Sequence, residues 1–215
     1  MKHIGKSYDK VDAKGILSGK PSYTGDFVPK DALIIKVLRS PHAQAKIKSI
    51  DTSKAKLIPG VEAIFTYEDV PNTRFTLAGQ TYPEPSAYDA LILDSVVRYV
   101  GDEVALIVAK DEATALKAMP LIKVEYEVQK PVLDLCTAMD HETVVHPEDD
   151  ILNHIPVGQD YKRNICVSYH KRVGDIEGEL AKCDYVVEGT YFDQATRQSA
   201  MEPFQSFGYI DHLGR

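Results

Sequence analysis

Apolar positions in the first third of the chain follow the period of β-strands. Residues 32–40, ALIIKVLRS, are apolar on both alternating faces and are interrupted by Lys36. This pattern predicts a central strand covered on both sides. Residues 43–48 alternate small or apolar side chains with polar ones, which is typical of a half-buried strand. A further strand is predicted at residues 61–66, VEAIFT.

A short helix is predicted between the second and third of these strands. Asp51 or Thr52 can act as its N-cap, because both side chains can accept a hydrogen bond from a free N–H group of the first helical turn. Pro59 and Gly60 follow after about two helical turns and end the helix.

Residues 104–120 show a clearer pattern of apolar and polar positions. Residues 104–109, VALIVA, are continuously apolar and predict a strand buried on both faces. Asp111 can cap the next helix, and Pro120 ends it because proline has no N–H to donate to the last turn. The apolar stripe predicted for this helix consists of Ala113, Leu116 and Met119.

Residues 122–128 alternate between apolar and charged side chains and predict one more strand. The order strand, helix, strand over residues 103–128 describes a compact βαβ unit, which implies some parallel pairing. The fold class predicted for residues 1–133 is therefore α/β, of mixed α+β character.

The periodicity is lost in the middle of the chain. Residues 134–164 are polar, acidic and proline-containing, which indicates a connector that wraps over a surface. The elements predicted after the connector are strands at 165–173, 185–193 and 205–211, with a helix at 175–183.

The last predicted element is a turn at Asp211–Gly214, where the returning strand of a hairpin should begin. We therefore expect this chain to be part of a longer polypeptide. We also expect an exposed apolar patch around residues 185–210.

The composition is that of an ordinary soluble globular protein. Of 215 residues, 44% are hydrophobic and 27% are charged, with a net charge of −7. This balance argues against a nucleic-acid partner, since such proteins need basic surfaces to neutralise phosphates. The longest apolar run, residues 104–109, is too short to span a bilayer, and the N-terminus has no apolar core of a secretory signal. We therefore expect no membrane partner.

Three cysteines, Cys136, Cys166 and Cys183, are widely spaced and form no CxxC pair. They indicate reduced thiols in a cytoplasmic protein rather than a disulfide framework. No cue for a lowered thiol pKa precedes them, so we expect them to be small, buried hydrophobic side chains.

One dense group of metal-ligating residue types lies in and beside the connector. Imidazole and carboxylate ligands would suit zinc or non-haem iron. However, the spacings match neither an i, i+4 helical pair nor an alternating strand, and a solvated acidic connector explains the residues equally well. We therefore predict no metal site. The residues are His141, His146, His154, Asp140, Glu148, Asp149 and Asp150.

Isolated candidates for catalysis have structural interpretations that we favour. Asp26 directly follows Gly25, and Glu103 lies two positions after Gly101. Both could be catalytic carboxylates, but a turn residue and the start of a strand explain them better. His42 lies in a turn without a carboxylate or cysteine at a useful spacing and is interpreted as scaffold. The chain has neither a glycine-rich phosphate loop nor a GxSxG motif, so the residues alone reveal no catalytic set.

Several segments resemble one protein family in order and spacing: GKPSYTGDF, ALIIKVLRSPHAQAKIKSIDTSKAKLIPGVEAIFTYEDVP, VVRYVGDEVALIVAKDEATA and IKVEYEV. The family is that of the large, molybdenum-binding subunit of xanthine dehydrogenases and aldehyde oxidases. The segments are similar to its N-terminal α/β hammerhead domain. Farther on, VGDIEGELAKCDYVVEGTYFDQATRQSAMEP resembles the first strands of its molybdopterin-binding domain. The resemblance thus implies a hammerhead domain at 1–133, an acidic connector at 134–164 and the start of a molybdopterin-binding domain at 165–215.

In function, the resemblance implies part of a molybdenum hydroxylase. Such enzymes insert a water-derived oxygen at a carbon of an N-heterocycle or an aldehyde, using molybdopterin, and pass electrons to iron–sulfur clusters and usually FAD. The implied partners are the rest of the polypeptide, the iron–sulfur and FAD subunits or domains, and further copies in an oligomer. The substrate, whether purine, aldehyde, nicotinate or another, is left open.

No catalytic residue is carried over from the family to this chain. The glycine-rich cofactor loops and the Gln-Gly-x-Gly-Glu stretch that holds the family's base do not occur in it, so no cofactor is expected on the chain itself. Gln198 and Glu202 are the candidates nearest to the cofactor-binding region. The alternative is a stand-alone, non-catalytic binding or assembly module of hammerhead fold.

Overall fold

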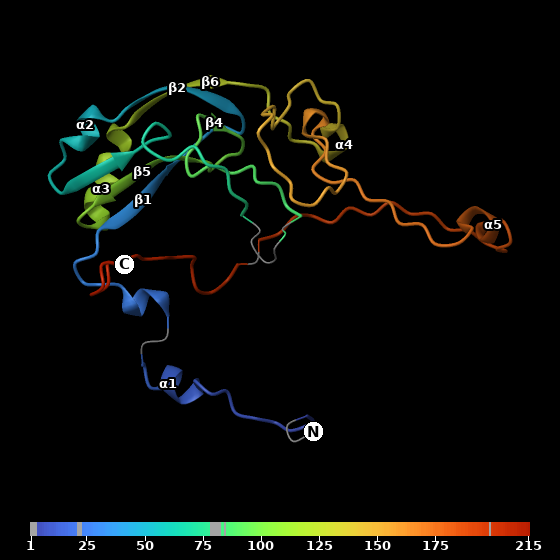
Figure 1. Ribbon diagram of the computed structural model, residues 1–215, viewed down its shortest axis with the longest axis horizontal. Helices are drawn as coiled ribbons and strands as arrows, with labels where there is room; N and C mark the ends of the chain where they lie inside the picture. Colours follow the sequence, from blue (N-terminus) through green and yellow to red (C-terminus); the bar gives the residue numbers. More distant parts are fainter. Residues whose placement is uncertain (1–3, 21–22, 78–82, 84, 198) are drawn as a thin grey trace. The chain divides into compact units, whose positions relative to one another are not determined.

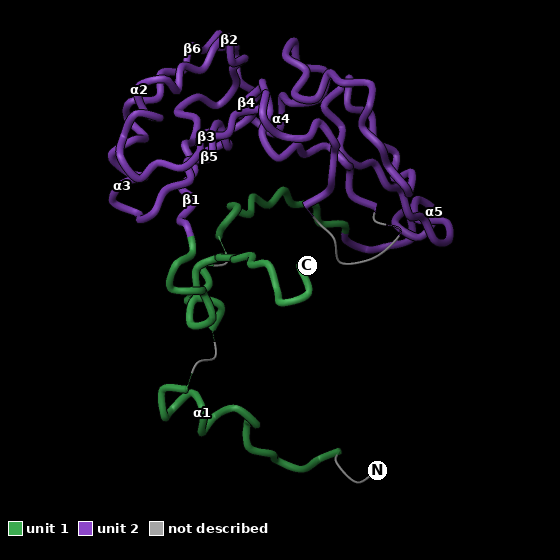
Figure 2. The backbone as a smooth tube through the Cα atoms, turned by 60° about the vertical axis from the view of Figure 1, so that its left-hand side comes forward, with its two compact units in different colours: residues 1–32, 186–215 green, residues 33–185 purple. Residues whose placement is uncertain are grey.

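The computed structural model describes residues 4–20, 23–77, 83, 85–197 and 199–215. The chain divides into two compact units, a larger one of residues 33–185 and a smaller one of residues 1–32 and 186–215 (Figure 2). The larger unit holds all six strands of the described residues. We call strands β1 to β6 with helices α2 and α3 the two-sheet core.

The first sheet has three antiparallel strands in the order β1, β5, β3 (Figure 1). These strands span Ile34–Arg39, Glu103–Ala109 and Val61–Phe65, respectively. The prediction of a strand buried on both faces is confirmed for β5, since Val104 and Ile107 are completely buried. The central position allows β5 to remove apolar side chains on both faces from water.

Strand β1 lies at the edge of this sheet, so the prediction of a central strand at 32–40 is wrong. Among the described strands, β1 pairs only with β5. Ile35 in its middle is 58% exposed. Apolar side chains on both faces are compatible with either position, and β5, with its uninterrupted apolar run, takes the centre.

The second sheet has the order β4, β2, β6 and is also antiparallel. The strands span Val96–Val97, Ala45–Asp51 and Lys123–Val128, respectively. Within β2 the predicted alternation is confirmed, because Ala45 and Ile47 are buried whereas the lysines between and after them are exposed. Just before the strand the prediction is wrong, since Gln44, expected on the polar face, is buried.

The parallel pairing predicted for residues 103–128 is wrong. Strands β5 and β6 belong to different sheets, and every pair among the described strands is antiparallel. Helix α3, Glu112–Ala118, carries the chain from one sheet to the other instead of back along the same sheet. The spacing along the sequence does not distinguish these connections, because a crossover of similar length serves both.

Helix α3 begins as predicted but buries a different face. The Asp111 side chain accepts a hydrogen bond of 2.7 Å from the backbone N–H of Thr114 and so caps the helix. The predicted stripe is wrong, since Leu116 is 51% exposed. Small side chains allow the helix to pack closely on the sheet, in one hydrophobic cluster with β5. The buried residues are Thr114, Ala115 and Ala118.

The other helical elements of the core are short. Helix α2, Ser53–Lys56, is about one turn long rather than two. Asp51 accepts a hydrogen bond of 2.9 Å from the Ser53 N–H, whereas Thr52 makes no side-chain cap. A 3-10 turn at Met119–Leu121, which includes Pro120, ends α3 where the sequence predicts.

The connector, residues 134–164, contains no regular strand, as predicted. It has one helical turn, α4 (Leu135–Ala138), and a 3-10 turn, η3 (Tyr161–Arg163). An isolated bridge joins Leu152 to Tyr88. Backbone hydrogen bonds between strands hold the two sheets together. The connector has no such ladder, so it depends more on hydrogen bonds and ion pairs of its side chains.

The strands predicted at 165–173, 185–193 and 205–211 are absent from the structure. No strand among the described residues lies beside them to complete a ladder, and a strand is stable only with a partner. The intervening helix is present as α5 (Ile176–Leu180), capped by Asp175. The turn at the end is also present, since the Gly214 N–H donates to the Asp211 carbonyl at 3.0 Å.

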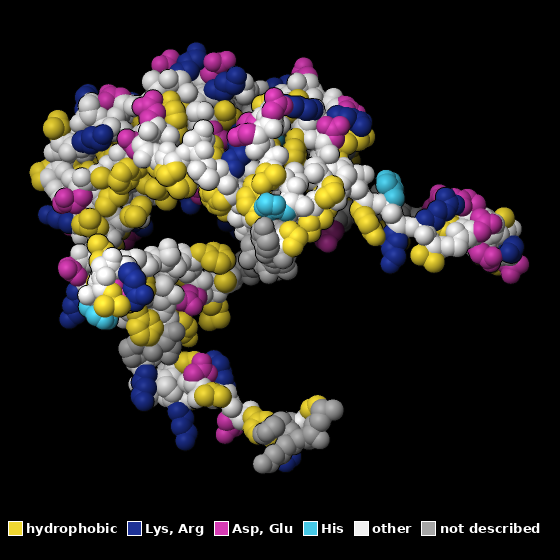
Figure 3. All heavy atoms as spheres, in the orientation of Figure 1, with side chains coloured by type: hydrophobic (Ala, Val, Ile, Leu, Met, Phe, Trp, Pro, Cys, Tyr) yellow, Lys and Arg dark blue, Asp and Glu magenta, His cyan; other side chains and the backbone are white. Residues whose placement is uncertain are grey.

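The smaller unit contains helix α1 (Ala13–Leu17), a 3-10 turn η1 (Thr24–Phe27) and residues 186–215. The apolar exposure predicted around residues 185–210 is confirmed, and Figure 3 shows hydrophobic side chains at the surface of the molecule. None of the helices in the described part of the chain has the length and hydrophobicity needed to span a bilayer. Side chains that are 90% exposed or more include Val187, Tyr191, Phe192, Met201 and Phe204.

Candidate functional site

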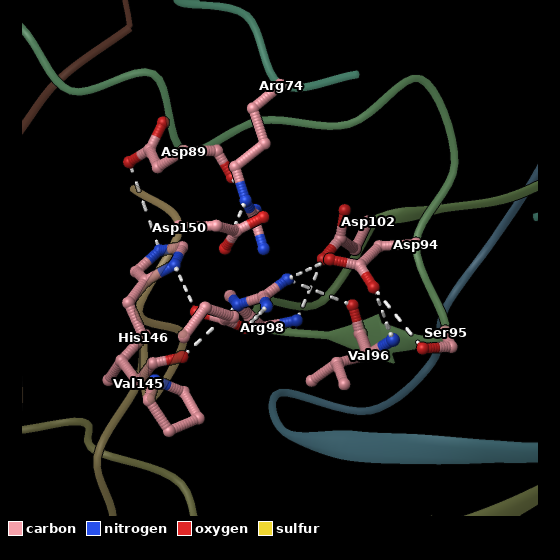
Figure 4. Close-up of polar contacts among 12 residues, drawn as sticks. Arg74, Asp89, Asp94, Ser95, Val96, Arg98, Asp102, Val145, His146 and Asp150 are labelled. Carbon is pink, nitrogen blue, oxygen red and sulfur yellow. Dashed lines mark hydrogen bonds and ion pairs between the residues drawn. The ribbon is translucent and has the colours of Figure 1, made fainter. Parts of the chain in front are cut away.

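Arg98 follows strand β4 directly and is the centre of a cluster of charged side chains (Figure 4). Its side chain is only 11% exposed. On the side of the two-sheet core, Nη1 donates to Asp94 Oδ2 at 2.8 Å and to the Val96 carbonyl at 3.2 Å. Asp94 is fixed in turn by the Val96 N–H, which donates to its Oδ1 at 3.1 Å.

The same guanidinium reaches the connector. Arg98 Nε donates to the Val145 carbonyl at 3.2 Å, and Nη2 donates to Glu148 Oε1. Burial by itself would lower the pKa of Arg98, but the hydrogen bonds and charges of Asp94 and Glu148 outweigh it and raise the pKa. A permanently charged arginine thus ties the connector to the core.

His146 lies between two carboxylates of this cluster. Its Nδ1 is 3.4 Å from Glu148 Oε2, and its Nε2 is 3.9 Å from Asp89 Oδ2. The pKa of His146 is lowered, mainly by burial and then by the charge of Arg98, while Glu148 and Asp89 oppose the change. The imidazole is therefore neutral at pH 7.

Two further contacts surround the cluster. The backbone N–H of Arg98 donates to Asp102 Oδ2 at 2.7 Å, and burial raises the pKa of the Asp102 carboxyl. Arg74 donates to the Asp89 carbonyl at 3.0 Å and pairs with Asp150 across 2.9 Å between Nε and Oδ1. Arg74 therefore makes a second link between the core side and the connector.

The side chain of Asn164 forms hydrogen bonds with the backbone at three positions of the connector. Its Oδ1 accepts from the Val145 N–H at 2.8 Å, and its Nδ2 donates to the carbonyls of Ala138 and Thr143 at 3.0 and 2.9 Å. Its φ of 59° is left-handed, which Asn tolerates better than most residues. One side chain thus joins three points of a segment that lacks regular structure.

Two clefts of about 560 and 490 Å³ adjoin the cluster. Asp89 and His146 line both of them. The larger cleft is lined largely by small apolar side chains such as Ala87, Val145 and Val157, and the smaller one by Phe75, Tyr99 and acidic groups. The charges at this site are already paired with one another, which suits a structural junction better than a catalytic centre.

The structure separates the residues of the metal hypothesis. His141 accepts a hydrogen bond at Nδ1 from the Thr143 N–H, and the ring of His154 packs edge-on against Tyr88. Of the three histidines, only His146 belongs to the charged cluster, together with Glu148 and, through Arg74, Asp150. The described part of the chain contains no group of three or more His, Cys, Asp or Glu side chains that could hold a metal ion. The carboxylates Asp140 and Asp149 pair with Arg163 and Lys162, respectively.

The isolated candidates have structural contacts. Asp26 accepts from the Tyr23 N–H at 3.0 Å within η1, and Glu103 at the start of β5 pairs with Arg39 at 2.7 Å. His42 packs edge-on against Tyr126, with ring centroids 4.8 Å apart. The structure thus places Asp26 in a turn, Glu103 at the start of a strand and His42 beside the ring of Tyr126. The expectation of buried cysteines is wrong, because the three free thiols are exposed: Cys136, Cys166 and Cys183.

The candidates nearest to the expected cofactor region are Gln198 and Glu202. Gln198 lies outside the described residues. Glu202 is exposed and lies in a bend of the smaller unit. A pterin phosphate needs free N–H donors or cations, yet Arg98 is matched by Asp94 and Glu148. The charged cluster around Arg98 therefore offers no unpaired guanidinium to a pterin phosphate, and we derive no chemical step through molybdopterin.

Arg98 and Asn164 are absent from the sequence-based candidates. Arg98 interrupts an apolar stretch shortly before β5, which hints at a buried charge, but its partner Glu148 lies 50 positions away. Asn164 follows two basic residues in a polar segment, and nothing in that pattern distinguishes it from an exposed loop residue.

The sequences of known proteins align with most of this chain. Over 97% of the chain, 38% of aligned residues are identical to "Probable hypoxanthine oxidase XdhD" of Escherichia coli (strain K12), of which the chain spans 24%. Identity to the carbon monoxide dehydrogenase large chain of Afipia carboxidovorans is 30% over 99% of the chain, which spans 26% of that protein. The chain thus spans about a quarter of the length of these relatives.

Solved structures of molybdenum enzymes and aldehyde oxidoreductases also resemble a large part of this chain. The carbon monoxide reduced state of Cu,Mo-CO dehydrogenase is 30% identical, with a TM-score of 0.59, over 82% of this chain and 22% of that one. The aldehyde oxidoreductase from Desulfovibrio gigas is 29% identical, with a TM-score of 0.58, over 66% of this chain and 16% of that one. Both matches confirm the mixed α/β fold.

The family match covers the two-sheet core. Residues 18–130, more than half of the chain, match the family described as "Aldehyde oxidase and xanthine dehydrogenase, a/b hammerhead domain". This range includes all six strands and helices α2 and α3, so the hammerhead fold expected from the resemblance is confirmed. The chain belongs to the aldehyde oxidase and xanthine dehydrogenase hammerhead family.

Proposed function

We propose that this chain is the hammerhead-containing, N-terminal portion of the molybdenum-binding subunit of a molybdenum hydroxylase. The complete protein would insert a water-derived oxygen at a carbon of an N-heterocycle or an aldehyde. Relatives that support this proposal include XdhD and the xanthine dehydrogenase molybdenum-binding subunit of Escherichia coli O157:H7, of which the chain spans 24% and 26%. Molybdopterin, iron–sulfur clusters and FAD would be held by other segments or subunits of a cytoplasmic, oligomeric complex.

Within that enzyme the chain would act as scaffold. The observation that carries this part of the proposal is the pairing of charges around Arg98, which leaves the cluster no free cation for a phosphate and joins the core to the connector. We propose residues 1–133 as the hammerhead domain, 134–164 as its connector and 165–215 as the start of the molybdopterin-binding domain. Segments 165–173 and 185–193, which form no ladder here, would find strand partners in the remainder of the polypeptide.

The test uses the complete polypeptide loaded with molybdenum, assayed with hypoxanthine and with a simple aldehyde. Glu202→Gln and Glu103→Gln should leave kcat nearly unchanged, because neither carboxylate would touch the reacting atoms. Loss of a general base typically lowers the rate by about 10²-fold or more, so a fall of that size in either variant would overturn the scaffold assignment. A complete polypeptide that retains no molybdenum would favour the stand-alone hammerhead module instead.

A further inference from the structure

Helices α2 and α3 cover only one face of the first sheet. Directly opposite residues of antiparallel strands place their side chains on the same face, so the register assigns each residue of β1, β5 and β3 to a face. One face holds Ala105, Ile107 and Ala109 of β5, which are completely buried in a hydrophobic cluster with residues of both helices. Helix α3 and the single turn α2 therefore form the layer on this side (Figure 1).

The opposite face presents apolar side chains from all three strands. In the central strand, Leu106 and Val108 are only partly buried, although the residues that alternate with them are completely buried. On the outer strands, Ile35 is 58% exposed and Phe65 is 40% exposed. Every member of this surface, which we call the open face, is apolar. The open face consists of Ile35 and Val37 of β1, Leu106 and Val108 of β5, and Ala63 and Phe65 of β3.

We propose that an amphipathic helix of the same polypeptide, from beyond these 215 residues, packs on the open face. This assignment rests on the proposed function, in which the chain is the N-terminal portion of a longer subunit. The relatives are long enough to supply such a helix, because the chain spans only 24% of XdhD and 26% of the xanthine dehydrogenase molybdenum-binding subunit of Escherichia coli O157:H7.

The width of the open face matches one helix. Neighbouring strands lie about 4.8 Å apart, so the two outer strands of the sheet are about 10 Å apart. An α-helix with its side chains is about 10–12 Å across. On the covered face of the same strands, one helix and one additional turn already suffice for this width. Apolar side chains at positions i, i+3, i+4 and i+7 of the incoming helix would remove the open face from water.

The open face is too small to hold a partner that is not covalently attached. Two side chains on each of three strands present on the order of 200 Å². A second copy of the chain, or another protein, would bury on the order of 400 Å² in total there, whereas a stable interface needs about 1,200 Å². A helix of the same polypeptide avoids most of the loss of translational and rotational freedom that opposes association of separate molecules. Its effective concentration at the open face is set by the connecting chain.

Photo-cross-linking in the complete polypeptide, expressed in a host that makes the cofactor, identifies the occupant. The photoreactive residue p-benzoylphenylalanine replaces Phe65 in one variant and Ile35 in another, so the two probes stand on the two outer strands of the open face. We expect both probes to cross-link to one and the same peptide, which lies beyond residue 215 and has apolar residues at helical spacing. Peptide mass spectrometry identifies the cross-linked residues, and the second position serves if the first variant fails to fold.

The matched control carries the same probe at Leu116. This residue is 51% exposed on α3, the helix that covers the other side of the sheet. A probe at Leu116 should therefore not reach the peptide that is linked to Phe65 and Ile35.

Three results would overturn the assignment of the open face. They are a link to a second copy, recognised by its doubled mass, a link to a different subunit, and the absence of links from both open-face probes. The molybdenum content of the same preparation tests the proposed function separately. A polypeptide that holds molybdenum but lacks the expected links contradicts only the helix on the open face, whereas a polypeptide without molybdenum contradicts the proposed function.

Discussion

Arg98 beside strand β4 and Glu148 in the connector form an ion pair although 50 positions separate them in the sequence. With Asp94 at 2.8 Å on its other side, the guanidinium is bound by one carboxylate from the core and one from the connector. Besides the isolated bridge between Tyr88 and Leu152 and the Arg74–Asp150 pair, Arg98 thus provides a charged link between the family domain and the segment that follows it.

Arg98→Met should destabilise the larger unit strongly. It leaves Asp94 and Glu148, each 20% exposed, without their cation, and breaking such a pair costs about 3 kcal/mol. Chemical denaturation of the 215-residue chain measures the free energy of unfolding. Arg39→Met is the matched control, because its pair with Glu103 is 52% and 37% exposed and should contribute less than about 1 kcal/mol. Equal losses in both variants would contradict the special position of Arg98.

Asn164→Ala should loosen the connector more than the core. The change removes three hydrogen bonds and places alanine at a φ of 59°, for a combined cost of about 3 kcal/mol. Asn164→Gly separates the two causes, because glycine adopts this φ freely and loses only the hydrogen bonds. Exchange of the Val145 amide measures both. If the glycine variant exchanges at the wild-type rate, the side chain of Asn164 does not organise the connector.

Ile107→Ala should be among the most damaging truncations in the core. Ile107 is fully buried in β5, and loss of a buried isoleucine side chain to alanine costs about 2–5 kcal/mol. Ile35→Ala, in the neighbouring edge strand and 58% exposed, should cost less than about 1 kcal/mol. Denaturant midpoints of the two variants distinguish the central strand from the edge strand. A reversed order would mean that β1, and not β5, is the central strand.

The cap of α3 should weaken in acid. Hydrogen bonds from Thr114 hold the pKa of Asp111 below its ordinary value of 3.8. The depressed pKa means that the ionised cap stabilises the fold fully above about pH 4 and is lost as the pH falls through the folded-state pKa. Asp111→Asn keeps an acceptor that does not titrate. Its Tm should therefore fall less between pH 5 and pH 2 than that of the wild type, and an identical fall would contradict the role of the cap.

Periodicity predicted the elements that are stable locally or buried on a defined face. Strand β2, strand β5 and the Asp111 cap follow from alternation, a continuous apolar run and a capping residue, respectively. The edge position of β1 and the antiparallel pairing of β5 could not be predicted in this way. Both depend on which strands become neighbours, and the hydrophobic pattern of one strand carries no information about its partner.

The charged cluster illustrates the same limit. The sequence placed His146, Glu148 and Asp150 in one acidic connector, but their partners Arg98 and Arg74 come from the other side of the fold. A metal hypothesis arises when only the connector is considered, because carboxylates and imidazoles without visible cations resemble a ligand set. Arg98 and Arg74 supply the positive charge that balances these carboxylates. Because both lie far from the connector in the sequence, only the tertiary structure reveals that they pair with it.

The scaffold role is tested most directly by the molybdenum content of the purified 215-residue chain, expressed in a host that makes the cofactor. We predict no molybdenum or pterin above a buffer blank in this chain, and molybdenum together with pterin in the complete polypeptide prepared in parallel. Molybdenum bound in stoichiometric amount to the 215-residue chain itself would contradict the account, since the cofactor site would then lie within these residues.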